Sequence, residues 1–559
     1  MENNFLPISK EDLEKRGWHE LDIILITGDA YVDHPSYGVS VIGRVLEKAG
    51  FKVGVIAQPN WRDKNDFMKL GRPKLFFGIT SGNVDSMVAN YTANKKPRKT
   101  DDYSPQQKNQ FRPDRALIVY SNRAKEAFPD TKIVLGGIEA SLRRLVHYDY
   151  WSDSVRRSIL IDAKADILAY GMAEKAIVEI AKRLSQNKEL YNIRGTVIVR
   201  KNFDSLENFL EIPSFEEIAL DKNRFNLAFR FIYENQNPFS AKILIQKHAD
   251  RFIVYFPPQL PLKTEELDEI FDLPYVRNWH PVYNKLGGIK AFETIKSSII
   301  AHRGCVGECS FCSLYFHQGR IVQSRSHASI LKEVKLITRQ SYFKGTISDV
   351  GGPTANLYSA ECDRWRKEGF CKDKKCLIPQ KCFNLKLNYD KCLNLYGKIK
   401  NIHGIKHVFI ASGFRYDLLI EKYAVKYLSE LCKYYISGQM KVAPEHAADN
   451  VLEIMNKPHF KIYEKFVHKF EQINKNLKKR CFLVNYFIIA HPGTTNNDAF
   501  ILKEYLRRKH IHPEQIQDFI PIPMTLSAAI YHTAKHPLTG YSIYIPKTFQ
   551  ERKLQRVMI

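Results

Sequence analysis

Short apolar segments bounded by glycine recur through the first 171 residues, and apolar residues at helical spacing separate them. These segments are 21–28, 50–57, 74–80, 132–137 and 165–171. Buried strands that alternate with helices are typical of a parallel, doubly wound sheet. The sequence therefore predicts an α/β fold whose N-terminal domain, over residues 1–186, is built on such a sheet.

Polar residues follow three of these segments, at 28–34, 81–83 and 136–141. The carboxyl ends of parallel strands lie at one edge of the sheet, where doubly wound proteins bind their ligands. A ligand site at this edge is one interpretation, and ordinary tight turns are the other. The stretch 96–115 carries several charges and three glutamines, and it predicts a flexible surface loop.

The pattern changes after residue 186. Strand-like segments such as 195–200 and 251–256 alternate with polar stretches. They predict a strand-rich connecting subdomain over residues 187–290.

Apolar segments that end in polar residues recur again in the second half of the chain, with helical stretches between them. These segments are 407–415, 439–446, 486–494 and 517–524. Such strands are typical of a β/α barrel, whose chemistry lies at the carboxyl ends of the strands. We predict a partial, TIM-like β/α barrel over residues 291–540, with a cysteine-rich insertion at 360–392 and a short C-terminal tail at 541–559.

Three cysteines, Cys305, Cys309 and Cys312, stand close together at the start of this region. Iron–sulfur cubanes are normally held by four cysteines, so three predict a 4Fe-4S cluster with one iron open to a non-protein ligand. Zinc is the alternative metal, because short cysteine spacings also suit a tetrahedral zinc site. His302 or His317 would then supply a fourth ligand.

Four further cysteines share the insertion: Cys362, Cys371, Cys376 and Cys382. Four thiols in one loop indicate a second metal site, which holds either an iron–sulfur cluster or zinc. Cys392 is a spare candidate ligand. All ten cysteines lie at or after position 305, and this clustering favours metal binding in a reducing cytoplasm over disulfides.

The formal net charge is +25, from 85 basic and 60 acidic side chains. Such a charge attracts polyanions, so nucleic acid is a candidate partner. Residues 1–20 contain no apolar run, and this predicts neither a signal peptide nor a membrane anchor.

Several specific runs together resemble the YgiQ family of radical S-adenosylmethionine (SAM) proteins over nearly the whole chain. These runs are 27–38, 56–59, 136–144, 305–312, 349–356 and 490–495. The resemblance implies an enzyme in which Cys305, Cys309 and Cys312 hold a 4Fe-4S cluster and SAM binds the open iron. It also implies an electron donor of the flavodoxin or ferredoxin type.

The same resemblance implies six cofactor-binding residues: Phe311, Gly351, Gly352, Ser412, Arg415 and Glu445. The glycine pair would approach the amino group of SAM. Ser412 and Arg415 would face its ribose and carboxylate, because an arginine fork binds both carboxylate oxygens. Glu445 and His446 would lie nearer the substrate. The alternative for Arg415 is an ion pair with Asp417 at a helix start.

The first domain is also similar to the cobalamin-binding-like module that precedes many radical SAM domains. The cobalamin loop D-x-H-x-x-G is replaced here by Asp33-His34-Pro-Ser-Tyr-Gly38, in which Asp and His are adjacent. We therefore predict that His34 is a loop histidine and not a cobalt ligand.

These features predict a radical SAM enzyme that cleaves SAM reductively to a 5′-deoxyadenosyl radical acting on an unknown substrate. The alternative is a non-catalytic, metal-stabilised protein that binds nucleic acid. Metal binding without SAM binding would favour the alternative.

Overall fold

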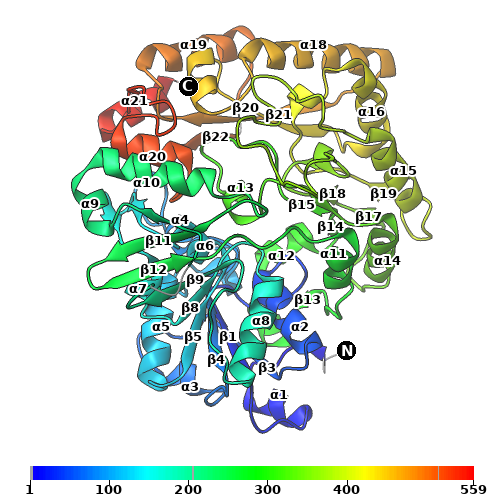
Figure 1. The fold of residues 1–559 in the computed structure, drawn as a ribbon. Helices are drawn as coiled ribbons and strands as arrows, with labels where there is room; N and C mark the ends of the chain where they lie inside the picture. Colours follow the sequence, from blue (N-terminus) through cyan, green and yellow to red (C-terminus); the bar gives the residue numbers. More distant parts are fainter. Residues whose placement is uncertain (1–3, 204–206, 514, 559) are drawn as a thin grey trace. The chain divides into compact units, whose positions relative to one another are not determined.

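The computed structural model of the chain describes residues 4–203, 207–513 and 515–558 (Figure 1). None of the helices in these described ranges is long and apolar enough to cross a membrane.

The chain folds into two compact units. The first unit comprises residues 1–260 and 269–296, and the second comprises residues 261–268 and 297–559. Each unit has its own strands and helices, so each is described by itself.

The first unit is built on a nine-stranded sheet with the order β10-β11-β12-β9-β8-β5-β4-β1-β3. The five strands from β8 to β3 in this order run parallel. They are β1 (Ile23–Thr27), β3 (Val53–Ala57), β4 (Phe76–Thr80), β5 (Lys132–Leu135) and β8 (Ile167–Ala169). Every residue of β1 is buried, as expected for a parallel strand that is covered on both faces.

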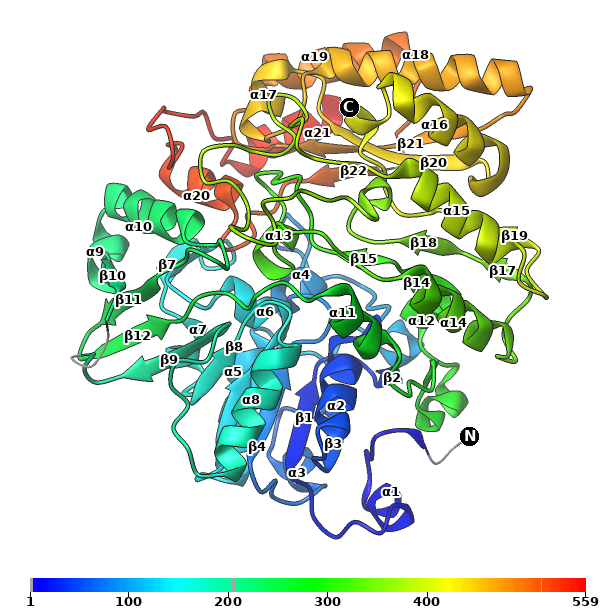
Figure 2. The same cartoon turned by 45° about the vertical axis from the view of Figure 1, so that its right-hand side comes forward.

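Helices cover both faces of the parallel strands (Figure 1 and Figure 2). Helices α2 (Gly38–Lys48) and α8 (Glu174–Ser185) pack together on one face. Helix α5 (Ala116–Ala127) packs with α3 (Asn65–Met68) and α7 (Ile159–Asp162) on the other. This arrangement confirms the predicted parallel, doubly wound sheet.

The strands expected in a separate connecting subdomain continue the same sheet. Strand β9 pairs antiparallel with β8, and β12, β11 and β10 follow it outward. Their bounds are β9 (Thr196–Arg200), β10 (Phe209–Ile212), β11 (Ile243–His248) and β12 (Arg251–Tyr255). A strand pattern shows which residues extend, whereas the partner strand depends on packing between distant segments.

The second unit contains an open arc of parallel strands. Strands β14 and β18 form one parallel pair, β17 and β19 form another, and β20, β21 and β22 form a three-stranded parallel sheet. A bridge between Phe414 and Val442 joins the segment after β19 to β20. The bounds are β14 (Ser298–Ile300), β17 (Thr346–Ile347), β18 (Asp349–Gly351), β19 (His407–Val408), β20 (Gln439–Glu445), β21 (Phe482–Ile489) and β22 (Gln515–Asp518).

Helices connect the successive strands of this arc. They are α14 (His327–Thr338), α15 (Tyr389–Lys400), α16 (Val425–Glu430), α18 (Phe460–Leu477) and α19 (Asn496–Arg508). In Figure 1 and Figure 2, α18 and α19 lie along the outer side of β20–β22. The alternation of parallel strands and outer helices confirms the predicted partial β/α barrel.

Candidate cluster and cofactor site

The cysteine triplet lies on a loop between β15 (His302–Arg303) and α13 (Leu314–His317). The backbone N–H of Cys305 donates to the Gly319 carbonyl oxygen at 3.1 Å, and the N–H of Cys312 donates to the Cys309 carbonyl oxygen at 3.0 Å. All three cysteines are half-buried and none forms a disulfide. One loop therefore presents three thiols together.

Contacts from distant segments hold this loop in place. The Ser310 N–H donates to the Met455 carbonyl oxygen at 3.0 Å. Asn456 Nδ2 donates to the Glu308 carbonyl oxygen at 3.0 Å. The thiols are thus positioned by the segment that follows α17 (Asp449–Ile454), and not by their own loop alone.

Burial raises the pKa of the Cys305 thiol to about 11, and the neighbouring Cys309 adds to this rise. Burial and Cys309 also raise the pKa of Cys312. Buried thiols of this kind lose their protons when a metal centre binds them as thiolates. The chemistry of the three donors therefore fits an iron–sulfur cluster.

The glycine pair lies at the carboxyl end of β18, where both residues pack closely against other side chains of the chain. A Cβ on Gly351 would lie 2.2 Å from Ser412 Oγ, and a Cβ on Gly352 would lie 2.5 Å from the ring of His302. Ser412 is held by Asp349, which accepts its N–H at 3.0 Å and its hydroxyl. The structure therefore brings Gly351 and Ser412 together at the ends of neighbouring strands.

The substitution Gly352→Ala is expected to destabilise the protein by about 1–3 kcal/mol, because the new methyl group collides with the buried His302 ring. Thermal unfolding measures this loss. The matched control is Gly413→Ala, where the nearest atom to a new Cβ is the Lys441 carbonyl oxygen at 4.0 Å. Equal melting temperatures for the two variants would contradict the close packing described here.

Arg415 forms the ion pair with Asp417 that the sequence offered as one of its two roles, and it also reaches the triplet. Its Nε and Nη2 donate to Asp417 at 2.8 Å and 2.6 Å. Its Nη1 lies 3.6 Å from Cys309 Sγ. The guanidinium of Arg415 therefore forms the ion pair with Asp417 and at the same time lies beside the triplet.

Glu445 ends β20 and is buried near the same loop. Burial raises the pKa of its carboxyl group, and the ammonium of Lys457, 3.5 Å away, opposes that rise. The charge of Glu445 acts on Cys312. His446 is fully buried, and its Nδ1 accepts the N–H of Ala448 at 3.0 Å, so it packs inside the unit.

A buried polar chain that sequence reasoning did not identify supports the triplet loop. His491 Nε2 lies 2.7 Å from the hydroxyl of Ser527, which hydrogen-bonds to Ser310 Oγ at 2.7 Å. Phe311 meets the ring of His491 edge to face, with ring centres 6.1 Å apart. Burial lowers the pKa of His491 to about 3, so the ring is neutral. Of the residues in this hydrogen-bonded series, only His491 and Ser310 belonged to runs, 490–495 and 305–312, that the sequence analysis had singled out.

Two family models match the chain. "Radical SAM N-terminal" covers residues 5–298, and "Radical SAM superfamily" covers residues 299–505. A UPF0313 protein from Clostridium botulinum is 51% identical over 559 residues, which are 100% of this chain and 87% of that protein. The chain belongs to the UPF0313 (YgiQ) family of radical SAM proteins. Another UPF0313 protein, from Methanocella arvoryzae, is 48% identical over 99% of this chain and 92% of its own length.

Membership in this family confirms the prediction of a radical SAM enzyme over that of a non-catalytic protein. Two solved structures share the fold. The radical SAM methyltransferase TsrM from Kitasatospora setae, with cobalamin and a [4Fe-4S] cluster bound, has a TM-score of 0.51 at 13% identity and covers 90% of this chain and 74% of its own. The cobalamin-dependent enzyme OxsB has a TM-score of 0.50 at 12% identity, over 93% of this chain and 56% of its own.

The turns at the carboxyl ends of β1 and β4 are where a doubly wound sheet would bind cobalamin. The strand order reverses between β1 and β4, and doubly wound sheets bind ligands in the crevice at that point. Here a Cβ on Gly28 would lie 2.3 Å from the Ser81 carbonyl oxygen, and a Cβ on Gly82 would lie 2.1 Å from Asp29 Oδ1. The turns that follow β1 and β4 therefore touch each other.

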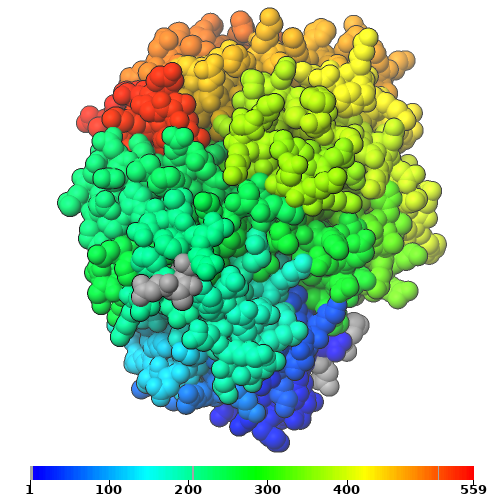
Figure 3. All heavy atoms as spheres, viewed as in Figure 1, coloured from blue at the N-terminus to red at the C-terminus, as the bar shows by residue number. Residues whose placement is uncertain are grey.

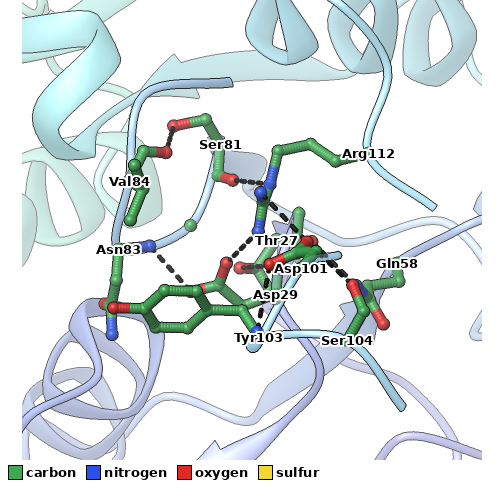
Figure 4. Close-up of polar contacts among 12 residues, drawn as sticks. Thr27, Asp29, Gln58, Ser81, Asn83, Val84, Asp101, Tyr103, Ser104 and Arg112 are labelled. Atoms are coloured by element: carbon green, nitrogen blue, oxygen red, sulfur yellow. Dashed lines mark hydrogen bonds and ion pairs between the residues drawn. The ribbon is translucent and has the colours of Figure 1, made fainter. Parts of the chain in front are cut away.

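A buried ion-pair network links these two turns to the segment that carries Arg112 and Asp101 (Figure 4). The guanidinium of Arg112 lies 2.6 Å from Asp29 and 3.2 Å from Asp101. Its Nε donates to the Ser81 carbonyl oxygen at 3.0 Å, and Asn83 N–H donates to Asp29 at 2.7 Å. Burial raises the pKa of Asp29 to about 6, and Arg112 opposes this rise. Arg112 and Asp101 belong to the stretch 96–115, so the expected flexible surface loop is wrong at its centre.

His34 is 1% exposed, and its Nδ1 accepts the N–H of Ser36 at 3.1 Å. This agrees with the prediction that His34 is a loop histidine. The crevice residues do not fit cobalamin, and no step of the chemistry is assigned to it.

We expect no cobalamin to bind when the full chain is mixed with hydroxocobalamin and passed through a gel-filtration column, because the turns after β1 and β4 touch each other and are joined by buried ion pairs. The visible absorbance of cobalamin in the protein peak measures binding. Co-elution of one cobalamin per chain would contradict the expectation.

Proposed function

We propose that Cys305, Cys309 and Cys312 hold a 4Fe-4S cluster, that SAM binds its open iron, and that the enzyme thereby acts on an unreactive carbon of its substrate. When bound, the reduced cluster supplies the electron that cleaves SAM to a 5′-deoxyadenosyl radical. The observation that carries the proposal is the placement of Arg415 Nη1, 3.6 Å from Cys309 Sγ. It puts a carboxylate-binding group directly beside the thiols.

The chain's own residues would bind and orient SAM. Asp417 holds Nε and Nη2 of Arg415, so the cationic Nη1 beside Cys309 is the donor proposed to meet the methionyl carboxylate. The backbone of Gly351 and Gly352 at the end of β18 is proposed to meet the amino group of SAM, as the family resemblance implies. Ser412, fixed by Asp349, is proposed to meet the ribose.

Phe311 and Glu445 are proposed to complete the pocket. Phe311 is half-buried and immediately precedes Cys312 in the triplet loop. Its ring is proposed to pack against an apolar part of SAM. Glu445 carries a buried carboxyl group close to Cys312, and we place it on the substrate side.

The proposal is tested on anaerobically reconstituted protein. Dithionite and SAM are added, and 5′-deoxyadenosine is measured by chromatography. We expect its release, with at least about four irons bound per chain. Iron binding without release, or zinc in place of iron, would refute the proposed function.

An electron donor of the flavodoxin or ferredoxin type is proposed as a partner, because reduction of the cluster requires one. Nucleic acid stays a prediction that rests on the net charge of +25, and its test is binding of labelled RNA at increasing salt. The cytoplasm stays the predicted location.

A further inference from the structure

The cysteine-rich insertion has almost no regular structure of its own. Residues 359–388 are all described, and they form no helix or strand apart from the bridge between Glu361 and Lys386. In Figure 3 this stretch falls within the yellow-green atoms, as the colour bar shows. A loop of this length inside a compact unit needs support beyond backbone hydrogen bonds.

The thiols of the insertion lie on one loop. Three of the four cysteines, Cys362, Cys376 and Cys382, pack against the same hydrophobic cluster. The N–H of Cys382 donates to the Cys376 carbonyl oxygen at 2.8 Å. All four residues are half-buried and none forms a disulfide.

These cysteines also lie next to the triplet. Cys362, Cys376 and Cys382 pack against one hydrophobic cluster, which Cys305 contacts as well. Buried members of the cluster come from both segments: Val306 from the triplet loop, and Trp365, Phe370, Leu377 and Leu385 from the insertion.

Two polar contacts fix the insertion to the triplet loop. Lys375 Nζ donates to Asn456 Oδ1 at 2.5 Å, and Asn456 in turn donates to the Glu308 carbonyl oxygen. Arg320 pairs with the Glu308 carboxylate at 2.8 Å and lies 4.6 Å over the ring of Phe370. Glu308 stands between Cys305 and Cys309, so both contacts reach the triplet itself.

The spacing of the thiols distinguishes between the two kinds of metal site. No three Cys, His, Asp or Glu side chains in the described ranges lie close enough together to hold a single metal ion. Sulfurs around one zinc ion, each about 2.3 Å from it, would be only about 4 Å apart. An iron–sulfur cubane bonds each thiolate to a different iron, so its cysteines stand farther apart. Neither the triplet nor the insertion, both within the described ranges, presents such a single-ion site.

We propose that Cys362, Cys371, Cys376 and Cys382 hold a second iron–sulfur cluster, beside the triplet site. Its four thiolates occupy all four irons, so it has no open position for SAM.

The test replaces the three triplet cysteines and measures how much iron the protein still binds. The variant Cys305→Ala/Cys309→Ala/Cys312→Ala is reconstituted anaerobically, and iron, sulfide and zinc are measured per chain, with Mössbauer spectra to identify the cluster. We expect about four irons in this variant and about eight in the unchanged chain. The variant Cys362→Ala/Cys371→Ala/Cys376→Ala/Cys382→Ala is expected to keep about four irons, those of the triplet. The control Cys432→Ala/Cys481→Ala is expected to keep about eight.

A triplet variant that has the circular dichroism of the unchanged chain but binds no iron, or binds one zinc ion, would overturn the second cluster. This measurement stands alone even if the insertion variant fails to fold. The outcome is also separate from SAM cleavage. Iron retained in the triplet variant, with no 5′-deoxyadenosine from the unchanged chain, would refute the proposed function and leave the second cluster in place.

Discussion

The substitution Cys309→Ala is expected to abolish the reductive cleavage of SAM, lowering 5′-deoxyadenosine release by more than about 100-fold. Loss of an outer-shell partner of a metal site already costs about 10–100-fold, and Cys309 is a proposed direct ligand. The remaining Cys305 and Cys312 leave two irons without thiolates. The loss also removes the sulfur that lies 3.6 Å from Arg415 Nη1. Product release under dithionite, together with iron content, measures the effect.

The matched control for this variant is Cys481→Ala. Cys481 is a half-buried cysteine far along the chain from the triplet, and its thiol contacts the Cys432 carbonyl oxygen at 3.7 Å. We expect this control to retain full cleavage. Cleavage that persists in Cys309→Ala would show that the triplet is not the site of SAM chemistry.

The substitution Arg112→Met is expected to destabilise the first unit by about 3–5 kcal/mol. Removal of one partner leaves the other charges buried and unpaired, and Arg112 has two carboxylates within 3.2 Å, those of Asp29 and Asp101. Urea unfolding followed by circular dichroism measures the loss in free energy of unfolding.

Arg157→Met is the control for this second variant. The Arg157 side chain is 49% exposed and pairs with Asp162 at 2.9 Å, and exposed ion pairs of this kind contribute at most about 1 kcal/mol. Adding Asp29→Asn to Arg112→Met is expected to recover part of the lost stability, because it removes one of the unpaired buried charges. Similar stabilities for Arg112→Met and Arg157→Met would contradict the role of the network in closing the crevice.

Much of the fold was predictable because it depends on local pattern. The apolar segment 21–28 contains β1, and the segment 439–446 contains β20. Strand β1 is buried along its whole length and is apolar up to its last residue, Thr27, whereas β20 alternates buried and more exposed residues. Both patterns are visible in a short window of the sequence. The length of each strand was less predictable, because the segment 407–415 forms only the short strand β19.

The candidate site was predictable where chemistry requires a residue type at a fixed spacing. The cysteine triplet and the pair Gly351–Gly352 are of this kind. The polar chain from His491 through Ser527 to Ser310 was not predictable, because its members are more than 30 residues apart along the chain and meet only through packing.

The sequence by itself determined the two α/β architectures and the donor set of the triplet, since apolar periodicity and thiol spacing act over a few residues. Only the tertiary structure decided that β9–β12 extend the first sheet and that Arg415 faces Cys309. It also decided that Arg112, in a stretch that reads as an exposed loop, is buried between Asp29 and Asp101. A charge has no preferred depth along a chain, because the free energy of burying it depends on the opposite charges that folding brings to it.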